Sequence, residues 1–176
     1  MNKYTLEQSW FPSFFFNNRD SAPLWFIIRL YVGYEWLVAG IDKVMSPVWF
    51  GSGAGAAMNG FVNGALAKTV GAHPDVQMWY AGFLKGAVLP NLVSWSNAIA
   101  VGEVLVGVGL IVGAVVGVAA FFGAFMNLNF MLAGTVSINP ILFTLSIFLI
   151  LAWRIAGYWG LDRYVLPRLH PTIRRT

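Results

Sequence analysis

The chain has no cysteine and few charged residues. The absence of cysteine excludes disulfides, iron–sulfur clusters and thiolate zinc sites in this chain. Charged residues make up 10% of the 176 residues, whereas a soluble domain carries about 25%. Hydrophobic residues make up 58% and aromatic residues 16%. This composition predicts one small integral membrane domain over residues 1–176, and not a soluble globular protein.

Histidine is also scarce. The two histidines, His73 and His170, both lie outside the strongest apolar runs. A haem held by two histidines across a helical bundle is therefore not expected, and we expect no metal, haem or iron–sulfur cluster. The first 23 residues lack the cationic start, aliphatic stretch and small-residue cleavage site of a signal peptide. We expect the first apolar segment to stay in the mature protein.

Four apolar segments predict four transmembrane helices. The first covers about 23–45 and ends at Ser46-Pro47. Residues 92–135 hold one charge, Glu103, and as a single helix would be about 66 Å long, twice the hydrocarbon thickness. A corner near Gly113–Gly117 therefore divides them into spans at about 92–113 and 117–135. After a turn at 135–140, the fourth span covers about 140–160.

Residues 46–90, between the first two spans, form an outer loop with an amphipathic stretch. Val76, Trp79, Tyr80, Phe83 and Leu84 recur at i, i+3, i+4, i+7 and i+8. That spacing places them on one face of a helix lying on the membrane surface or folded over the bundle. The expected fold is an all-α, four-helix transmembrane bundle with an amphipathic outer-loop helix.

Basic residues predict the orientation in the membrane. The tail at 161–176 carries more arginines than the outer loop carries lysines. Because cytoplasmic segments are enriched in lysine and arginine, both termini are expected in the cytoplasm and the chain in the cell membrane. The net charge of +4 is then explained by anionic lipid, and no nucleic acid partner is expected. The residues compared are Arg163, Arg168, Arg174 and Arg175 in the tail, and Lys68 and Lys85 in the loop.

Six polar side chains within the predicted spans are the candidates for buried function. Counting about 1.5 Å per residue from the outer helix ends places two glutamates near the midplane, two arginines in the inner leaflet and two asparagines in the outer half. Arg29 and Glu35 lie about 120° apart around their helix, so their partners are expected on other helices. Tyr31 lies one turn from Glu35 and is close enough along the helix to donate to it. The six residues are Arg29, Glu35, Glu103, Asn127, Asn129 and Arg154.

Two interpretations of these residues stay open. Buried Arg–Glu pairs and asparagines can fix helix register without any chemistry, and interfacial aromatic residues can serve as lipid anchors. Ionisable groups inside a membrane also mark ligand pockets and proton routes. On the second interpretation the glutamates exchange a proton, the arginines orient ligand oxygens and the outer aromatic residues line access from lipid. The candidates are then Glu35 and Glu103 for proton exchange, and Arg29, Tyr31, Glu35, Glu103, Asn127, Asn129, Arg154, Trp79, Tyr80 and Phe83 for ligand binding.

Four stretches between residues 24 and 167 carry a family resemblance. They read RLYVGYEWLVAGIDKV, NAIAVGEVLVGVGLIVG, FFGAFMNLNFMLAGTVSINP and LAWRIAGYWGLDRYVLP. Together they resemble the DoxX family of small four-helix membrane proteins. Its members include DoxD-type subunits of thiosulfate:quinone oxidoreductase and membrane partners of a secreted superoxide dismutase and a sulfurtransferase. The positions that match the family pattern are Arg29, Gly40, Lys43, Glu103, Gly107 and Asn127.

The resemblance implies a membrane subunit of an oxidoreductase system that binds a quinone or a similar amphipathic ligand. The chain lacks cysteine and a cofactor motif, so quinone or a soluble redox subunit would have to carry the electrons, and independent enzyme activity is not expected. Two alternatives stay open. One is a non-catalytic scaffold that docks soluble redox partners. The other is a small proton or solute carrier, which four spans disfavour unless the chain forms a homo-oligomer.

Overall fold

The computed structural model describes residues 10–169, and within that range it holds helices and no strand. The prediction of an all-α fold is confirmed. Two helical runs, 19–45 and 78–112, are long and apolar enough to cross a membrane, with 27 and 35 residues. Two shorter apolar helices cover 116–132 and 139–151. The part of the predicted basic tail beyond residue 169 lies outside the described residues.

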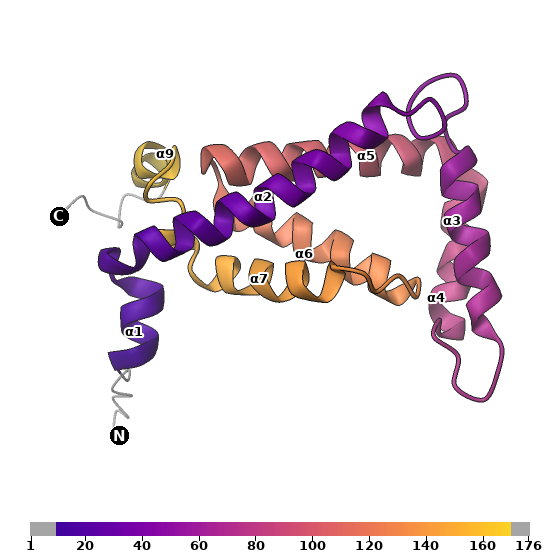
Figure 1. The fold of residues 1–176 in the computed structure, drawn as a ribbon, viewed down its shortest axis with the longest axis horizontal. Coiled ribbons are helices and arrows are strands. Elements are labelled where there is room, and N and C mark those ends of the chain that lie inside the picture. The colour runs from indigo at the N-terminus through magenta and orange to yellow at the C-terminus, as the bar shows by residue number, and fades with distance from the viewer. Residues whose placement is uncertain (1–9, 170–176) are drawn as a thin grey trace.

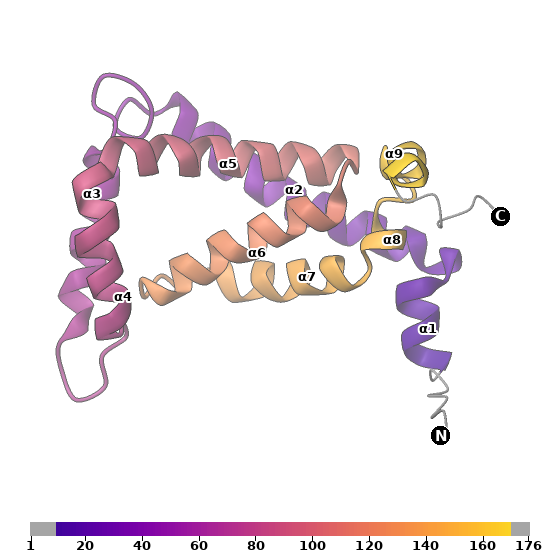
Figure 2. The same cartoon turned by 180° about the vertical axis from the view of Figure 1, so that it is seen from behind.

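Four helices form an elongated bundle (Figures 1 and 2). The helix that corresponds to the expected span of 140–160 is shorter than expected. It is interrupted at Ala152, and a short helix, α8 (Trp153–Ala156), follows. The bundle helices are α2 (Ala22–Met45), α5 (Leu92–Val112), α6 (Val116–Leu132) and α7 (Asn139–Leu151).

The corner between α5 and α6 is built on Gly113. This residue has φ +68°, a left-handed conformation that favours glycine, and its N–H donates to the carbonyl of Gly109. Val115, with φ +46°, completes the turn before α6 begins. The sequence predicted a corner at this place.

A two-helix lobe stands across one end of the bundle (Figure 1). It consists of α3 (Ala56–Leu66) and α4 (Met78–Phe83). The sequence indicated the amphipathic segment that holds α4, but as a separate helix over 75–88. In the structure α4 instead runs on through a π-helical turn (Leu84–Val88) and a 3-10 turn (Leu89–Asn91) into α5. The helix α3 was not expected from the sequence.

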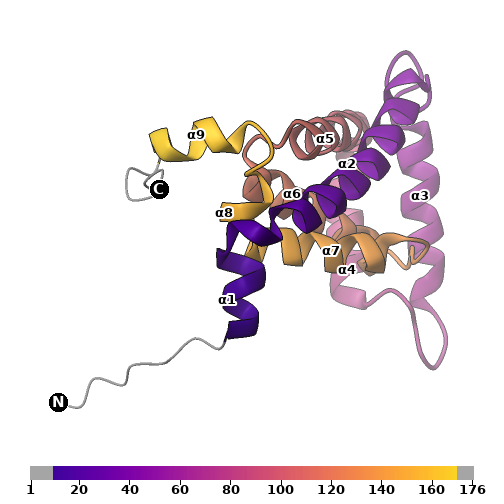
Figure 3. The same cartoon turned by 60° about the vertical axis from the view of Figure 1, so that its left-hand side comes forward.

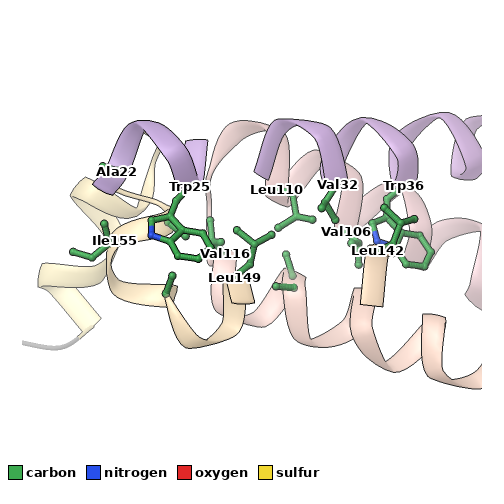
Figure 4. Packing of buried hydrophobic residues seen from close by; sticks show 14 residues of the cluster. Ala22, Trp25, Val32, Trp36, Val106, Leu110, Val116, Leu142, Leu149 and Ile155 are labelled. Atoms are coloured by element: carbon green, nitrogen blue, oxygen red, sulfur yellow. The ribbon is translucent and has the colours of Figure 1, made fainter. Parts of the chain in front are cut away.

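Close packing between α2 and α5 fixes their register. A Cβ added at Gly107 would lie 2.5 Å from the backbone nitrogen of Leu37, and one at Gly40 would lie 2.6 Å from that of Val104. Only glycine allows the two helices to approach this closely. The same pairing aligns the core of the bundle, where Trp36 packs with residues of α5 and α7 (Figure 4).

The end of the bundle opposite the lobe holds two further helices, α1 (Trp10–Asn17) and α9 (Asp162–Leu169) (Figure 3). Trp10, Trp159 and Tyr164 are exposed there. Exposed tryptophan and tyrosine beside basic residues are typical of a membrane–water interface.

Candidate ligand pocket and buried polar sites

An aromatic pocket of about 90 Å³ lies where the α3–α4 lobe meets α5 and α6. Its walls come from four helices and include two flexible methionines. The lining residues are Met58 and Phe61 of α3, Tyr80 and Phe83 of α4, Leu84 and Val88 of the π-helical turn, Trp95 and Ile99 of α5, and Phe125, Met126, Asn129 and Phe130 of α6.

The hydroxyl and the amide of this pocket are on Tyr80 and Asn129, and the indole N–H of Trp95 donates to the Ala87 carbonyl at 3.1 Å. Tyr80 is 4% exposed, and its hydroxyl is directed toward both oxygens of Asn129, the backbone carbonyl at 2.9 Å and Oδ1 at 3.2 Å. The Asn129 amide nitrogen donates to the Phe125 carbonyl at 2.8 Å. The pocket therefore presents one hydroxyl and one amide among aromatic rings, the mixture typical of sites for small amphipathic ligands.

Ring contacts continue from the lobe into the bundle. Phe83 lies between Tyr80 and Trp95, with ring centroids 5.6 and 5.8 Å away. On the other wall Phe130 contacts Phe61 at 6.0 Å and Trp36 at 6.4 Å. Phe130 thus separates the pocket from the core of the bundle.

Several buried polar atoms of the bundle helices α2, α6 and α7 have no hydrogen-bond partner among the described residues. They include the indole nitrogen of Trp36, both amide atoms of Asn127 and the hydroxyl of Ser146. Asn127 and Ser146 are fully buried. The indole can only donate a hydrogen bond, whereas the amide and the hydroxyl can donate and accept. These groups are rich in donors, which suits a carbonyl oxygen or water.

Glu103 forms an ion pair with Lys43. The Lys43 ammonium lies 2.7 Å from Oε2 of Glu103, whose side chain is 1% exposed. The Trp49 ring centroid lies 5.2 Å from the same ammonium. This pair joins the end of α2 to the middle of α5 and neutralises the buried carboxylate.

Arg29 stabilises the α5–α6 corner by donating hydrogen bonds to backbone carbonyls. Its guanidinium donates to the carbonyls of Leu110 and Ile111 at the end of α5, the second at 2.7 Å, and to the carbonyl of Trp159 at 3.2 Å. Carbonyls at the C-terminal end of a helix have no partner within the helix, and a cation there satisfies them.

Asp162 supports the same corner from the other side. Its carboxylate accepts from the amides of Val115 and Val116 at 2.6 and 2.9 Å, which caps the N-terminus of α6. Burial raises the pKa of the Asp162 carboxyl above its ordinary value, while those two amides and the nearby Arg29 oppose the rise.

The expected layers of charge are not present. The pairing of Gly40 with Val104 places Glu103 beside Gly40, five residues beyond Glu35 on α2, where Lys43 reaches it. Arg29 contacts backbone carbonyls and does not pair with Glu103. Arg154 is exposed beside the Trp153 ring and is not inside the bundle. The depth count took Met45 and Leu92 as level helix ends, whereas the register of α2 and α5 places Glu103 beside Gly40, near the end of α2.

The structure brings only part of the predicted set together. Tyr80, Phe83 and Asn129 line the aromatic pocket. Tyr31 and Trp79 are exposed, and Glu35 is half-buried with no hydrogen bond or ion pair to the described residues. Their roles in ligand binding stay predictions.

Several residues of these sites were not predicted. Asp162 was counted within the basic tail, although an aspartate opening a short helix is a recognisable N-terminal signal. Phe61 and Trp95 lie in segments that carried no chemical motif, and only the folded arrangement brings them to Tyr80. Among the residues described, no three histidine, aspartate or glutamate side chains gather as a metal site.

No protein-family model, curated protein or solved structure matches this chain.

Proposed function

We propose that the chain is a four-span protein of the cell membrane, with both termini in the cytoplasm, that binds the ring of a quinone in the aromatic pocket. As a membrane subunit of an oxidoreductase system, it would offer this ring to a soluble redox subunit. The observation that carries the proposal is the Tyr80 hydroxyl beside Asn129 within a pocket of aromatic rings. The resemblance of the sequence to the DoxX family points to the same class of ligand.

The membrane placement is supported by two long apolar helical runs and two shorter ones in one bundle. Exposed apolar side chains cover the bundle, including Phe121, Phe122 and Phe125 on α6, each more than half exposed. Such a surface would aggregate in water but suits acyl chains. The exposed arginines at the α8–α9 end support a cytoplasmic location for that end.

The chemistry of the pocket suits a quinone ring. Aromatic walls offer stacking surfaces, and the Tyr80 hydroxyl can turn from Asn129 to donate to a ring carbonyl. A quinone would supply the electron-carrying group that this chain lacks. The cavity is smaller than the roughly 150 Å³ that accommodates benzene, so binding requires side chains to move. Met58 and Met126 line the pocket, and methionine adapts readily to such changes.

Access to the pocket is lateral. Phe125 lines the pocket and is 54% exposed on the outer face of α6. In the proposed orientation that face lies against lipid, where quinones are dissolved. The ring would enter past Phe125, and its isoprenoid tail would remain among the acyl chains.

Fluorescence titration of the purified protein with a soluble menaquinone analogue tests this function. Saturable quenching of tryptophan emission is expected, because Trp95 lines the pocket. Tyr80→Phe removes one hydrogen bond and should weaken binding roughly 2- to 12-fold. Tyr34→Phe is the matched control, since Tyr34 is 60% exposed on α2, and it should bind like wild type. A linear, non-saturating titration, or equal affinity in Tyr80→Phe, would count against the proposal.

Docking of a soluble partner is a second function with an observation in its favour. The lobe and the segment that joins its two helices expose Val70, Met78 and Trp79, with 76%, 68% and 65% of their surfaces accessible. Exposed apolar residues on a segment outside the bundle are typical of protein contacts. If the lobe docks a partner, Trp79→Ala should reduce its recovery by crosslinking in cells while leaving quinone affinity unchanged. Equal recovery in both proteins would remove this function.

A further inference from the structure

A second, larger cavity lies at the opposite end of the bundle. It is a groove of about 410 Å³ between the first turns of α6, the end of α7, α8 and α9. Its walls are mostly apolar and include Val118 and Phe121 of α6, Ile150 of α7, Trp153 of α8 and Leu166 of α9. The volume falls in the range of small-molecule sites in proteins.

The groove opens on the apolar face of α6. Val118 and Phe121 line it and are 55% and 54% exposed. In the proposed membrane orientation this face meets acyl chains of the cytoplasmic leaflet. A hydrocarbon chain can therefore enter the groove from the side without crossing water.

The acidic group in the groove does not oppose an anion. Asp162 lines the groove, but its two carboxylate oxygens accept hydrogen bonds from Val115 and Val116. The Arg29 guanidinium interacts favourably with its charge. The negative charge is thus already compensated within the corner.

Two exposed arginines are next in sequence to residues that line the groove. The Arg154 guanidinium lies 5.2 Å from the ring centroid of Trp153, which forms one wall. Arg163 follows Asp162 on α9 and lies about 60° around that helix from Leu166, which forms another wall. Its guanidinium lies 5.5 Å from the ring centroid of Tyr158 and is exposed. An apolar groove with arginines beside it matches a lipid that has a hydrocarbon chain and an anionic headgroup.

We propose that this groove binds one anionic glycerophospholipid, with an acyl chain along Val118 and Phe121. Its phosphate is bound by Arg154 and by Arg163, whose exposed side chain turns from the Tyr158 ring to reach it. The bound lipid holds α9 at the membrane surface and fills the space between α6 and α9. This inference depends on the membrane placement, but not on the quinone pocket at the other end.

Quenching by brominated lipids tests the proposal. The full-length protein is placed in nanodiscs of phosphatidylcholine with a small mole fraction of phosphatidylglycerol or phosphatidylcholine brominated in its acyl chains. The difference between wild type and Trp153→Phe isolates the Trp153 emission. Brominated phosphatidylglycerol should quench this component more strongly. Each arginine is expected to contribute roughly fivefold to its apparent affinity.

Arginine variants distinguish a specific lipid site in the groove from non-specific electrostatic attraction of anionic lipid to the protein. Arg154→Gln/Arg163→Gln should abolish the preference for phosphatidylglycerol, and each single variant should reduce it. Arg174→Gln/Arg175→Gln removes the same two charges from the tail and should keep the preference. Equal quenching by the two lipids in wild type would overturn the proposal. So would a preference that survives in the first double variant, or one lost only in the tail variant.

Discussion

Lys43 and Glu103 form an ion pair 2.7 Å long between α2 and α5, with the glutamate 1% exposed and the lysine 20% exposed. The pair lies beside one of the two close contacts between these helices, at Gly40. Its position means that the buried acid of α5 is neutralised within the bundle. Nothing in this geometry requires Glu103 to exchange a proton with a ligand, and its clearest role is structural.

Removal of one partner of this pair should destabilise the bundle. Lys43→Met leaves the Glu103 carboxylate buried without a counter-charge, at a cost of about 3–5 kcal/mol. Lys43→Met/Glu103→Met removes both charges and should recover most of that loss. Thermal unfolding in detergent, followed by circular dichroism, measures the difference.

Lys85→Met is the matched control for the lysine, because Lys85 is exposed and its substitution should leave the melting temperature unchanged. A double variant that unfolds as early as Lys43→Met would contradict the structural role of the pair.

The register of α2 and α5 depends on Gly107. An alanine Cβ there would lie 2.5 Å from the Leu37 backbone nitrogen, which must move the two helices apart. Gly107→Ala should therefore destabilise by about 1–3 kcal/mol. Gly60→Ala in α3 provides the comparison, since nothing lies within 4 Å of its added Cβ. That variant should be neutral or slightly stabilising, by about 0.4–1 kcal/mol. Equal melting temperatures for the two variants would disprove the tight contact.

The α5–α6 corner should make stability depend on pH. Burial raises the pKa of Asp162 in the folded state above its ordinary value of 3.8. The folded protein therefore holds this proton more tightly than the unfolded chain. The associated stability is fully present below pH 3.8 and is lost as pH rises through the higher, folded pKa.

Asp162→Asn removes this titration while keeping one acceptor oxygen. Melting temperatures of wild type and variant, measured from acid to neutral pH, should show wild type losing stability relative to the variant as pH rises. Asp42→Asn, at an exposed position, should run parallel to wild type. If wild type instead gains stability relative to Asp162→Asn as pH rises, the direction given for the Asp162 pKa shift is wrong.

Hydropathy was sufficient to predict the bundle helices and the corner at Gly113. It did not indicate α3, because the glycines and asparagines of Ala56–Leu66 obscure a helix whose apolar residues Met58, Val62 and Ala65 face the core. The depths of the polar residues also could not be predicted from helix ends. They depend on the α2–α5 register, which the backbone contacts of Gly40 and Gly107 determine.

The pocket itself was predictable only in part. The spacing of Tyr80 and Phe83 placed both on one helical face, and Asn129 stood out as a polar residue in an apolar segment. Their meeting depends on the turn at Leu84–Asn91, which directs α4 along the lobe, and on the packing of α4 against α6. Tertiary contacts of this kind leave no periodic signal in the sequence.

Photolabelling with an azido-quinone analogue tests the central claim most directly, because it reports where the ring binds. The protein in nanodiscs is irradiated with the analogue, with and without excess menaquinone, and labelled peptides are mapped by mass spectrometry. We predict labels on residues 78–84 and 125–130, competed by menaquinone and reduced in Tyr80→Phe. Labels confined to the surroundings of Arg29 or Glu103, or labels that menaquinone does not compete, would contradict a quinone site at Tyr80 and Asn129.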